Sequence, residues 1–254
     1  MWKRIIGESQ RRIVLFKFAS TVVYPLNKLI LKIRCLRKIQ KCLRIGDFYF
    51  FFRPFIFSDL FTLFSDCEPY VKRIFKPRKG ETVFDAGAHI GIYTLRAAKN
   101  VGEEGIVVGF EPDDENFRLL QKNVQINGFK RVKLIKAALG KNDVEKVFYM
   151  AADPLYSSLL PSRVRVDTRE KKKVQVISLD SIVEKLKVTR IDWIKIDVEG
   201  GEMDVLEGGK KTFSNLVSKV IIETDNEKAL RFLCEKKFKI DRLFGFYYFA
   251  SKKN

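Results

Sequence analysis

The sequence contains few of the residues that bind zinc. It has one histidine, His89, and four cysteines, and no two of these cysteines form a Cys-x-x-Cys pair. Structural zinc sites take four ligands from closely spaced Cys and His residues, so we expect no zinc site. The scattered thiols also lack a disulfide pattern, which is typical of the reducing cytosol, and a cytoplasmic protein is expected.

A long uninterrupted hydrophobic segment is also missing. The longest apolar stretch, residues 13–31, is broken by Lys17, Pro25 and Lys28, and no small-residue cleavage site follows it. A secretory signal needs such a site after an apolar core, and a membrane-spanning helix needs about 20 mostly apolar residues. We therefore expect neither a signal peptide nor a transmembrane helix here.

Two motifs of nucleotide chemistry are absent as well. There is no Gly-x-Gly-x-x-Gly fingerprint, which places a pyrophosphate on a helix N-terminus. There is also no Asn-Pro-Pro-aromatic tetrapeptide of the kind that amino-group methylases of nucleic acids commonly use. These absences argue against a nicotinamide cofactor and against a nucleic-acid substrate.

Positive charge is present in excess and is unevenly distributed. The net charge is +18, and residues 1–46 hold twelve Lys and Arg but only one acidic residue. Between Leu26 and Leu43 the apolar side chains fall on one half of a helical wheel, which predicts a basic amphipathic helical extension over residues 1–46. This extension could pack on the rest of the protein, lie peripherally on the anionic cytoplasmic face of a membrane or, less favoured, contact nucleic acid.

The rest of the chain divides into two parts. Residues 47–80 are rich in Phe, and we expect them to form a cap of one hairpin and one helix over the core. Residues 81–254 alternate strand and helix patterns, which predicts one α/β domain with a mostly parallel sheet and two final antiparallel strands. Residues 140–178 break the alternation, and we expect irregular strands there, with Lys171–Lys173 in a solvated loop.

The first candidate site follows the first strand of this domain. Asp85 ends the strand, and Gly87 and Gly91 lie in the loop that opens the next helix. Ligands of open α/β sheets bind at this edge, and Gly87 would let the backbone approach one closely. A carboxylate repels pyrophosphate but suits an ammonium and a sulfonium, which favours S-adenosylmethionine. The alternative is that Asp85 only caps the helix.

A second acid, Glu111, ends the next strand. It lies twenty residues after Gly91, where a carboxylate can accept hydrogen bonds from both ribose hydroxyls. Adjacent parallel strands bring Asp85 and Glu111 to the same edge, so the two loops support each other.

Together these motifs resemble the FkbM family of methyltransferases. The resemblance spans residues 81–223, and its most specific part is the Asp-Val-Glu-Gly-x-Glu stretch from Asp197 to Glu202. It implies a Rossmann-like class I methyltransferase fold, with a seven-stranded, mostly parallel sheet and helices on both faces. It further implies S-adenosylmethionine as the donor and methyl transfer to a hydroxyl of a glycan, lipid-linked glycan or secondary metabolite.

The resemblance also implies roles for single residues. Asp85, Gly87 and Gly91 would contact the methionine part of the cofactor, and Glu111 would hold the ribose. Ala137 or Ala138 would lie near the adenine. His89 stands where the family most often has Asn, so we expect it to line the pocket as a donor, with a catalytic base as the alternative.

Three further acids, Asp197, Glu199 and Glu202, follow the fourth predicted strand. One of them could be the general base that takes the acceptor's hydroxyl proton. They could instead hold a divalent ion, or cap the next helix. We expect a base or substrate contact and no metal.

Two other functions stay open from the sequence. The basic charge allows a nucleic-acid methyltransferase, although the excess lies far in sequence from the predicted pocket. The domain could also bind the cofactor without turnover, as a membrane-associated scaffold.

Overall fold

The computed structural model describes residues 38–64, 68–151, 153, 157–161 and 168–252. The amphipathic helix expected over residues 1–37 lies outside them. The end of that expected helix is wrong, because Lys41–Ile45 forms strand β1, which pairs antiparallel with β2 (Phe48–Phe52). Gly46, at φ +58°, makes the turn, and the aromatic residues of β2 favour a strand partner over a helix.

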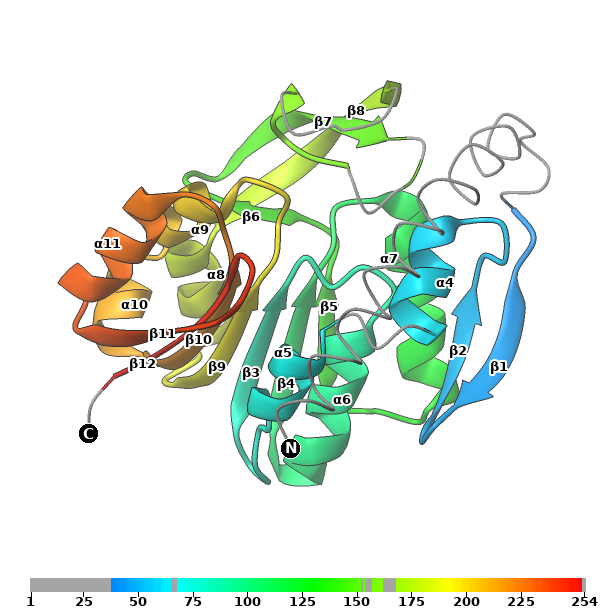
Figure 1. Cartoon of the computed structure of the whole chain (residues 1–254), viewed down its shortest axis with the longest axis horizontal. Helices are drawn as coiled ribbons and strands as arrows, with labels where there is room; N and C mark the ends of the chain where they lie inside the picture. Colours follow the sequence, from blue (N-terminus) through cyan, green and yellow to red (C-terminus); the bar gives the residue numbers. More distant parts are fainter. Residues whose placement is uncertain (1–37, 65–67, 152, 154–156, 162–167, 253–254) are drawn as a thin grey trace, which may run out of the picture.

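The central sheet has seven strands in the order β5-β4-β3-β9-β10-β12-β11. The strands are β3 (Thr82–Ala86), β4 (Ile106–Phe110), β5 (Val132–Ile135), β9 (Ile191–Ile196), β10 (Val217–Glu223), β11 (Phe238–Phe244) and β12 (Tyr247–Lys252). The first five pair in parallel, and β12 runs antiparallel between β10 and β11 (Figure 1). The mostly parallel sheet and its final antiparallel pair are as expected.

Helices cover both faces of this sheet. They are α6 (Ile92–Val101), α7 (Asp114–Ile126), α8 (Leu179–Leu186), α9 (Glu202–Gly208), α10 (Lys210–Asn215) and α11 (Glu227–Glu235), with a 3-10 turn η2 at Gly102–Glu104. Neighbouring strand residues point to opposite faces, so Val83 packs with α6 and α7 whereas Phe84 packs with α8 to α11. The expected Rossmann-like methyltransferase fold is confirmed.

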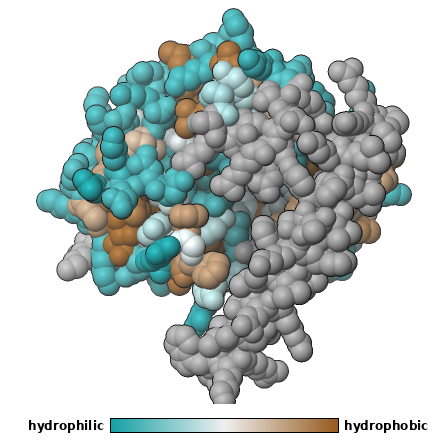
Figure 2. Space-filling view, turned by 45° about the horizontal axis from the view of Figure 1, so that its top comes forward, coloured by the Kyte–Doolittle hydropathy of each residue, from teal (hydrophilic) through white to brown (hydrophobic). Residues whose placement is uncertain are grey.

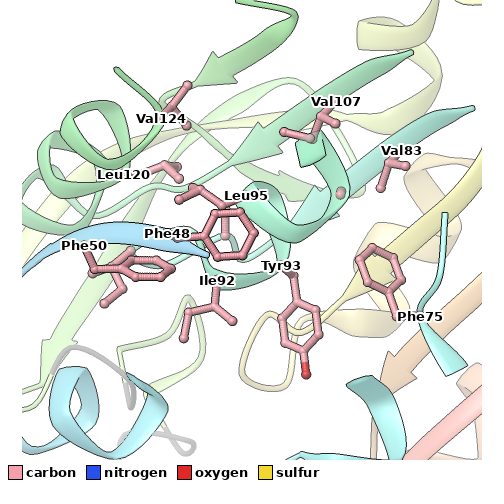
Figure 3. Close-up of a cluster of buried hydrophobic side chains, with 14 of the residues drawn as sticks. Phe48, Phe50, Phe75, Val83, Ile92, Tyr93, Leu95, Val107, Leu120 and Val124 are labelled. Carbon is pink, nitrogen blue, oxygen red and sulfur yellow. The ribbon is translucent and has the colours of Figure 1, made fainter. Parts of the chain in front are cut away.

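The segment before the α/β domain covers the first of these faces. It consists of the β1–β2 hairpin and of α4 (Phe57–Phe64) and α5 (Pro69–Ile74). Phe48 and Phe50 join the core around Leu95 and Leu120 (Figure 3). The side chain of Asn123 on α7 accepts a hydrogen bond from the Phe51 amide, at 2.6 Å, so the hairpin is fixed to the domain by polar as well as apolar contacts.

Three strands between residues 138 and 178 form a second sheet, which is more regular than expected. Strand β8 (Thr168–Ser178) lies between β6 (Ala138–Gly140) and β7 (Val144–Ala151). Lys171–Lys173 belongs to β8 and not to a loop, because its backbone pairs with β7. Its side chains contact Tyr149 and Glu145 on β7 and Asp114 on α7. The expected solvated loop is therefore wrong.

The described surface is mainly polar. On the face shown in Figure 2, hydrophobic patches are separated by hydrophilic residues. Within the described part of the chain, no helix is both long and apolar enough to span a membrane.

Candidate functional site

A cavity of about 410 Å³ lies at the carboxyl ends of the central strands. Eight of the residues expected at the site line it: Asp85, Gly87, His89, Glu111, Ala137, Ala138, Asp197 and Glu199. Gly91 and Glu202 do not line it. The topology therefore brings together residues that are up to 114 positions apart in the sequence, from the ends of β3, β4 and β9.

Asp85 lines this cavity and is 1% exposed. Its Oδ2 accepts a 2.6 Å hydrogen bond from the Thr94 hydroxyl, whereas its Oδ1 has no hydrogen-bond partner among the described residues. Burial raises the pKa of this carboxyl above its ordinary value. A buried acid with an unsatisfied oxygen is suited to a ligand that brings a donor or a positive charge.

The two glycines of the first loop serve packing. Gly87 has φ +83°, and a Cβ there would lie 1.8 Å from the carbonyl oxygen of Asp197, so its small size lets the β3 and β9 loops touch. Gly91 has φ +102°, and a Cβ there would lie 2.6 Å from Leu120 Cδ1. Gly91 is the N-cap of α6 and does not line the cavity, so its expected contact with the cofactor stays a prediction.

Glu111 is held by backbone donors. Its Oε2 accepts from the His89 amide at 2.8 Å, and its Oε1 accepts from the Asp113 amide at 2.9 Å. Burial, together with the Asp113 carboxylate, raises the pKa of Glu111 to about 8. The side chain is thus fixed in direction and lies in the cavity beside Ala137 and Ala138, where a hydroxyl-bearing ligand would meet it.

His89 adopts φ +50°, an unusual conformation for a residue with a Cβ. Burial lowers the pKa of its imidazole to about 4, so the ring is uncharged at neutral pH. Its Nε2 lies 3.7 Å from Asp59 Oδ1 and has no hydrogen-bond partner among the described residues. A neutral ring of such low pKa is a weak base, which favours the expected role as a pocket-lining group.

The opposite end of the cavity contains a buried cation. Lys195 is 3% exposed, and its Nζ lies 2.7 Å from Asp197 Oδ2 and 4.7 Å from the centre of the Tyr93 ring. Burial would lower the pKa of Lys195, but the carboxylates of Asp197 and of its neighbours outweigh burial and raise it. Lys195 therefore stays charged and balances part of the negative charge around it.

Sequence reasoning missed a second acid at this end, Glu68. It accepts hydrogen bonds from the hydroxyls of Tyr93 and Tyr247, the latter at 3.1 Å. Glu223 lies nearby, and burial with the Asp197 charge raises its pKa to about 8. Glu68 and Tyr247 are 179 residues apart, and Glu68 lies before the domain, so no local pattern pointed to either of them.

Glu202 stabilises the loop after β9 and does not line the cavity. It is 4% exposed, and its Oε1 accepts from the Gly200 amide at 2.8 Å, while Glu199 lines the cavity with φ +53°.

Two consecutive serines lie beside this loop. Ser157 lines the cavity, and Ser158 donates to the Glu199 carbonyl oxygen at 2.7 Å. Among the described residues, no three His, Cys, Asp or Glu side chains are grouped to hold a metal ion.

The sequence was compared with known proteins. Two fungal proteins are similar: Methyltransferase 1 of Beauveria bassiana (strain ARSEF 2860) is 28% identical over 165 residues, and Methyltransferase sdnD of Sordaria araneosa is 25% identical over 177. The aligned regions cover 58% and 59% of this chain, and 66% and 68% of the relatives. The chain thus spans about two thirds of the length of the relatives that it matches.

Solved structures are more distant. A SAM-dependent methyltransferase from Aquifex aeolicus aligns with TM-score 0.41 and 16% identity, covering 73% of this chain and 87% of that one. An rRNA methylase from Streptococcus thermophilus aligns with TM-score 0.43 and 10% identity, covering 73% and 93%. These likenesses say nothing of the acceptor, and they give no support to the expectation that nucleic acid is an unlikely partner.

A protein-family model also matches the chain. The model of the methyltransferase FkbM domain matches residues 85–240, which include the strand ends at Asp85, Glu111 and Asp197. The match covers more than half of the chain and starts at Asp85, a carboxylate that lines the cavity. The chain therefore belongs to the FkbM methyltransferase family.

Proposed function

We propose that this chain transfers the methyl group of S-adenosylmethionine, the cofactor of its family, to a hydroxyl oxygen of a small molecule or glycan. One observation carries the proposal: two buried carboxylates, Asp85 and Glu111, end neighbouring parallel strands and line the same cavity. Aspartate and glutamate at these two positions suit the two ends of the cofactor, one cationic and one bearing ribose hydroxyls.

The residues present fit this cofactor. The unsatisfied Oδ1 of Asp85 would accept from the ammonium group of the methionine part. Glu111 would accept from the ribose hydroxyls, and Ala137 and Ala138 leave flat apolar space beside it for the adenine. When bound, the cofactor supplies an electrophilic methyl group, and the protein has to place an acceptor oxygen in line with it.

The acceptor would enter at the end of the cavity where Asp197, Glu199 and Glu223 lie. A general base works best when its pKa lies near the working pH, and Glu223, with a pKa of about 8, meets this condition. Asp197 is paired with Lys195 and would orient the hydroxyl. Glu202 points into its own loop, so we assign it a structural role.

Methyl transfer is tested with cofactor carrying a labelled methyl group and a panel of hydroxylated glycans, lipid-linked glycans, secondary metabolites and RNA. Label on a hydroxyl compound, lost in Glu223→Gln and Asp197→Asn, would support the proposal. Label on RNA alone would replace it with a nucleic-acid methyltransferase. Cofactor binding without any transfer across the panel would favour a non-catalytic scaffold.

A further inference from the structure

A buried ion pair lies beside the cavity, in the segment before the matched domain. Arg53 follows β2 and is 2% exposed, and Asp59 on α4 is fully buried. Asp59 Oδ1 accepts from Arg53 Nη2 at 2.7 Å, and Asp59 Oδ2 accepts from Arg53 Nε at 2.9 Å and from the Arg53 amide at 2.8 Å. This bidentate geometry fixes both side chains.

The pair is connected to Glu111 through one residue of α7. Arg53 Nη2 donates to Asn116 Oδ1 at 2.7 Å, and Asn116 Nδ2 lies 3.5 Å from Glu111 Oε1. Asn116 also donates its backbone amide to Asp113, whose own amide bonds to the same Glu111 oxygen. A continuous chain of polar contacts thus runs from the cap to Glu111, the acid proposed to hold the ribose.

The Arg53–Asp59 pair also lies close to His89, the other polar residue beside Glu111 in the cavity. Asp59 Oδ1 lies 3.7 Å from His89 Nε2, and the backbone amide of His89 donates to Glu111 Oε2. His89 and Glu111 are therefore in contact with each other. His89 lies directly beside the Arg53–Asp59 pair, whereas Glu111 is joined to the pair through Asn116.

We propose that Arg53 and Asp59 are positioning residues for cofactor binding, acting on Glu111 through Asn116 and on His89 directly. The inference rests on the proposed use of S-adenosylmethionine. It means that the cofactor site is not contained in residues 85–240 alone, because two of the residues that arrange it come from the cap. A buried ion pair is a costly way to gain stability, which argues that this one serves geometry.

The test uses the full chain and two kinds of variant. Arg53→Met/Asp59→Asn removes both charges together and keeps a side-chain oxygen for the backbone amide of residue 53. Asn116→Ala leaves the ion pair intact and cuts its link to Glu111. The matched control is Lys99→Met, which removes an exposed 2.6 Å ion pair with Asp47 that joins the same hairpin to α6 away from the cavity.

Two readouts separate positioning from stability. The first is the dissociation constant of S-adenosylmethionine, measured by calorimetry on samples that circular dichroism shows to be folded. The second is the ¹⁵N spectrum of the imidazole in the ligand-free protein, which reports on His89 alone because it is the only histidine. We expect the dissociation constant to rise about tenfold in the double variant and in Asn116→Ala. We expect the imidazole signal to move in the double variant, and neither readout to change in Lys99→Met.

Unchanged affinity in folded Asn116→Ala and in the double variant, with an unmoved His89 signal, would overturn the inference even if melting temperatures fell. If the double variant does not fold, the affinity of Asn116→Ala for S-adenosylmethionine tests the proposal, and an unchanged affinity would overturn it. If the wild-type chain binds no S-adenosylmethionine, the proposed function fails. In that case the positioning proposal fails as well. A His89 signal that still moves in the double variant would show that the Arg53–Asp59 pair arranges the cavity wall but has no role in cofactor binding.

Discussion

The two ends of the cavity hold their carboxylates in different ways. At the end near Ala137, Glu111 is fixed by the backbone amides of His89 and Asp113. At the opposite end, Asp197 is held by the side chain of Lys195, and Glu68 by two tyrosine hydroxyls. Backbone donors come with the loop conformation, whereas the two tyrosine donors to Glu68 come from separate segments, α6 and β12.

This difference suits two different tasks. A cofactor site that is fixed by the backbone changes little when side chains vary. The proposed acceptor end, built from Glu68 before α5 and from side chains of α6, β9, β10 and β12, can be altered one residue at a time. The first end should therefore respond to changes in loop geometry, and the second to changes in charge.

The largest effect, a loss of stability, is expected where the β3 loop touches the β9 loop, at Gly87. Gly87→Ala would place a Cβ 1.8 Å from the Asp197 carbonyl oxygen, at a φ that disfavours any Cβ. We expect a loss of about 4 kcal/mol or more in the free energy of unfolding, measured by urea denaturation. The control is Gly245→Ala, which has a similar positive φ but open space, and should cost about 1 kcal/mol. Equal losses would mean that the loops do not depend on this contact.

The next largest effect is expected at the backbone-held acid. Glu111→Ala removes the acceptor of the ribose hydroxyls, and we expect calorimetry to show an affinity for S-adenosylmethionine at least about 100-fold weaker. Glu104→Ala, which breaks an exposed ion pair with Lys79, serves as the control and should bind normally. Normal binding by Glu111→Ala would show that this end does not hold the ribose.

An effect of similar size, here on stability, is expected at the side-chain-held end. Lys195→Met leaves Asp197 without its cation, and we expect a loss of about 3 kcal/mol in the free energy of unfolding. Lys219→Met is a close match on the next strand, since Lys219 lies over Trp193 and pairs with Glu81 at 3.4 Å. Lys219 is more exposed, so its loss should stay below about 1 kcal/mol. A reversed order would contradict the importance of the buried cation.

The smallest effect is a dependence on pH. The pKa of Glu111 is about 8 in the folded chain and 4.5 ordinarily, so its contribution to stability is full below pH 4.5 and is lost as the pH rises through 8. Ribose hydroxyls favour the ionised carboxylate, so cofactor binding at pH 7 should release about one proton. Calorimetry in two buffers of different ionisation enthalpy measures this release. It should vanish in Glu111→Gln and persist in Glu223→Gln, and its loss in Glu223→Gln instead would place the ribose at the wrong end.

The backbone-held end was largely predictable from the sequence. Asp85 and Glu111 end apolar strands that alternate with helices, and this pattern fixes both the sheet and the edge at which they meet. Only part of the opposite end could be predicted from the sequence. Asp197 follows the same rule, but Glu68, Tyr93 and Tyr247 converge through tertiary packing that no local period encodes.

The errors have the same physical origin. Lys41–Ile45 has amphipathic spacing for a helix, yet pairing with the aromatic strand Phe48–Phe52 decides its conformation. The Lys171–Lys173 run resembles a loop until its carboxylate and tyrosine partners are known. The contact of Gly91 with the cofactor stays a prediction, since Gly91 does not line the cavity and a Cβ there would lie against Leu120.

The most direct test of this account is a calorimetric titration of the purified chain with S-adenosylmethionine and, separately, with NAD. The account predicts one site for S-adenosylmethionine, no heat of binding with NAD, and loss of the site in Glu111→Ala. Binding of NAD, or the absence of S-adenosylmethionine binding in a folded sample, would contradict the assignment of Asp85 and Glu111 to the methyl donor.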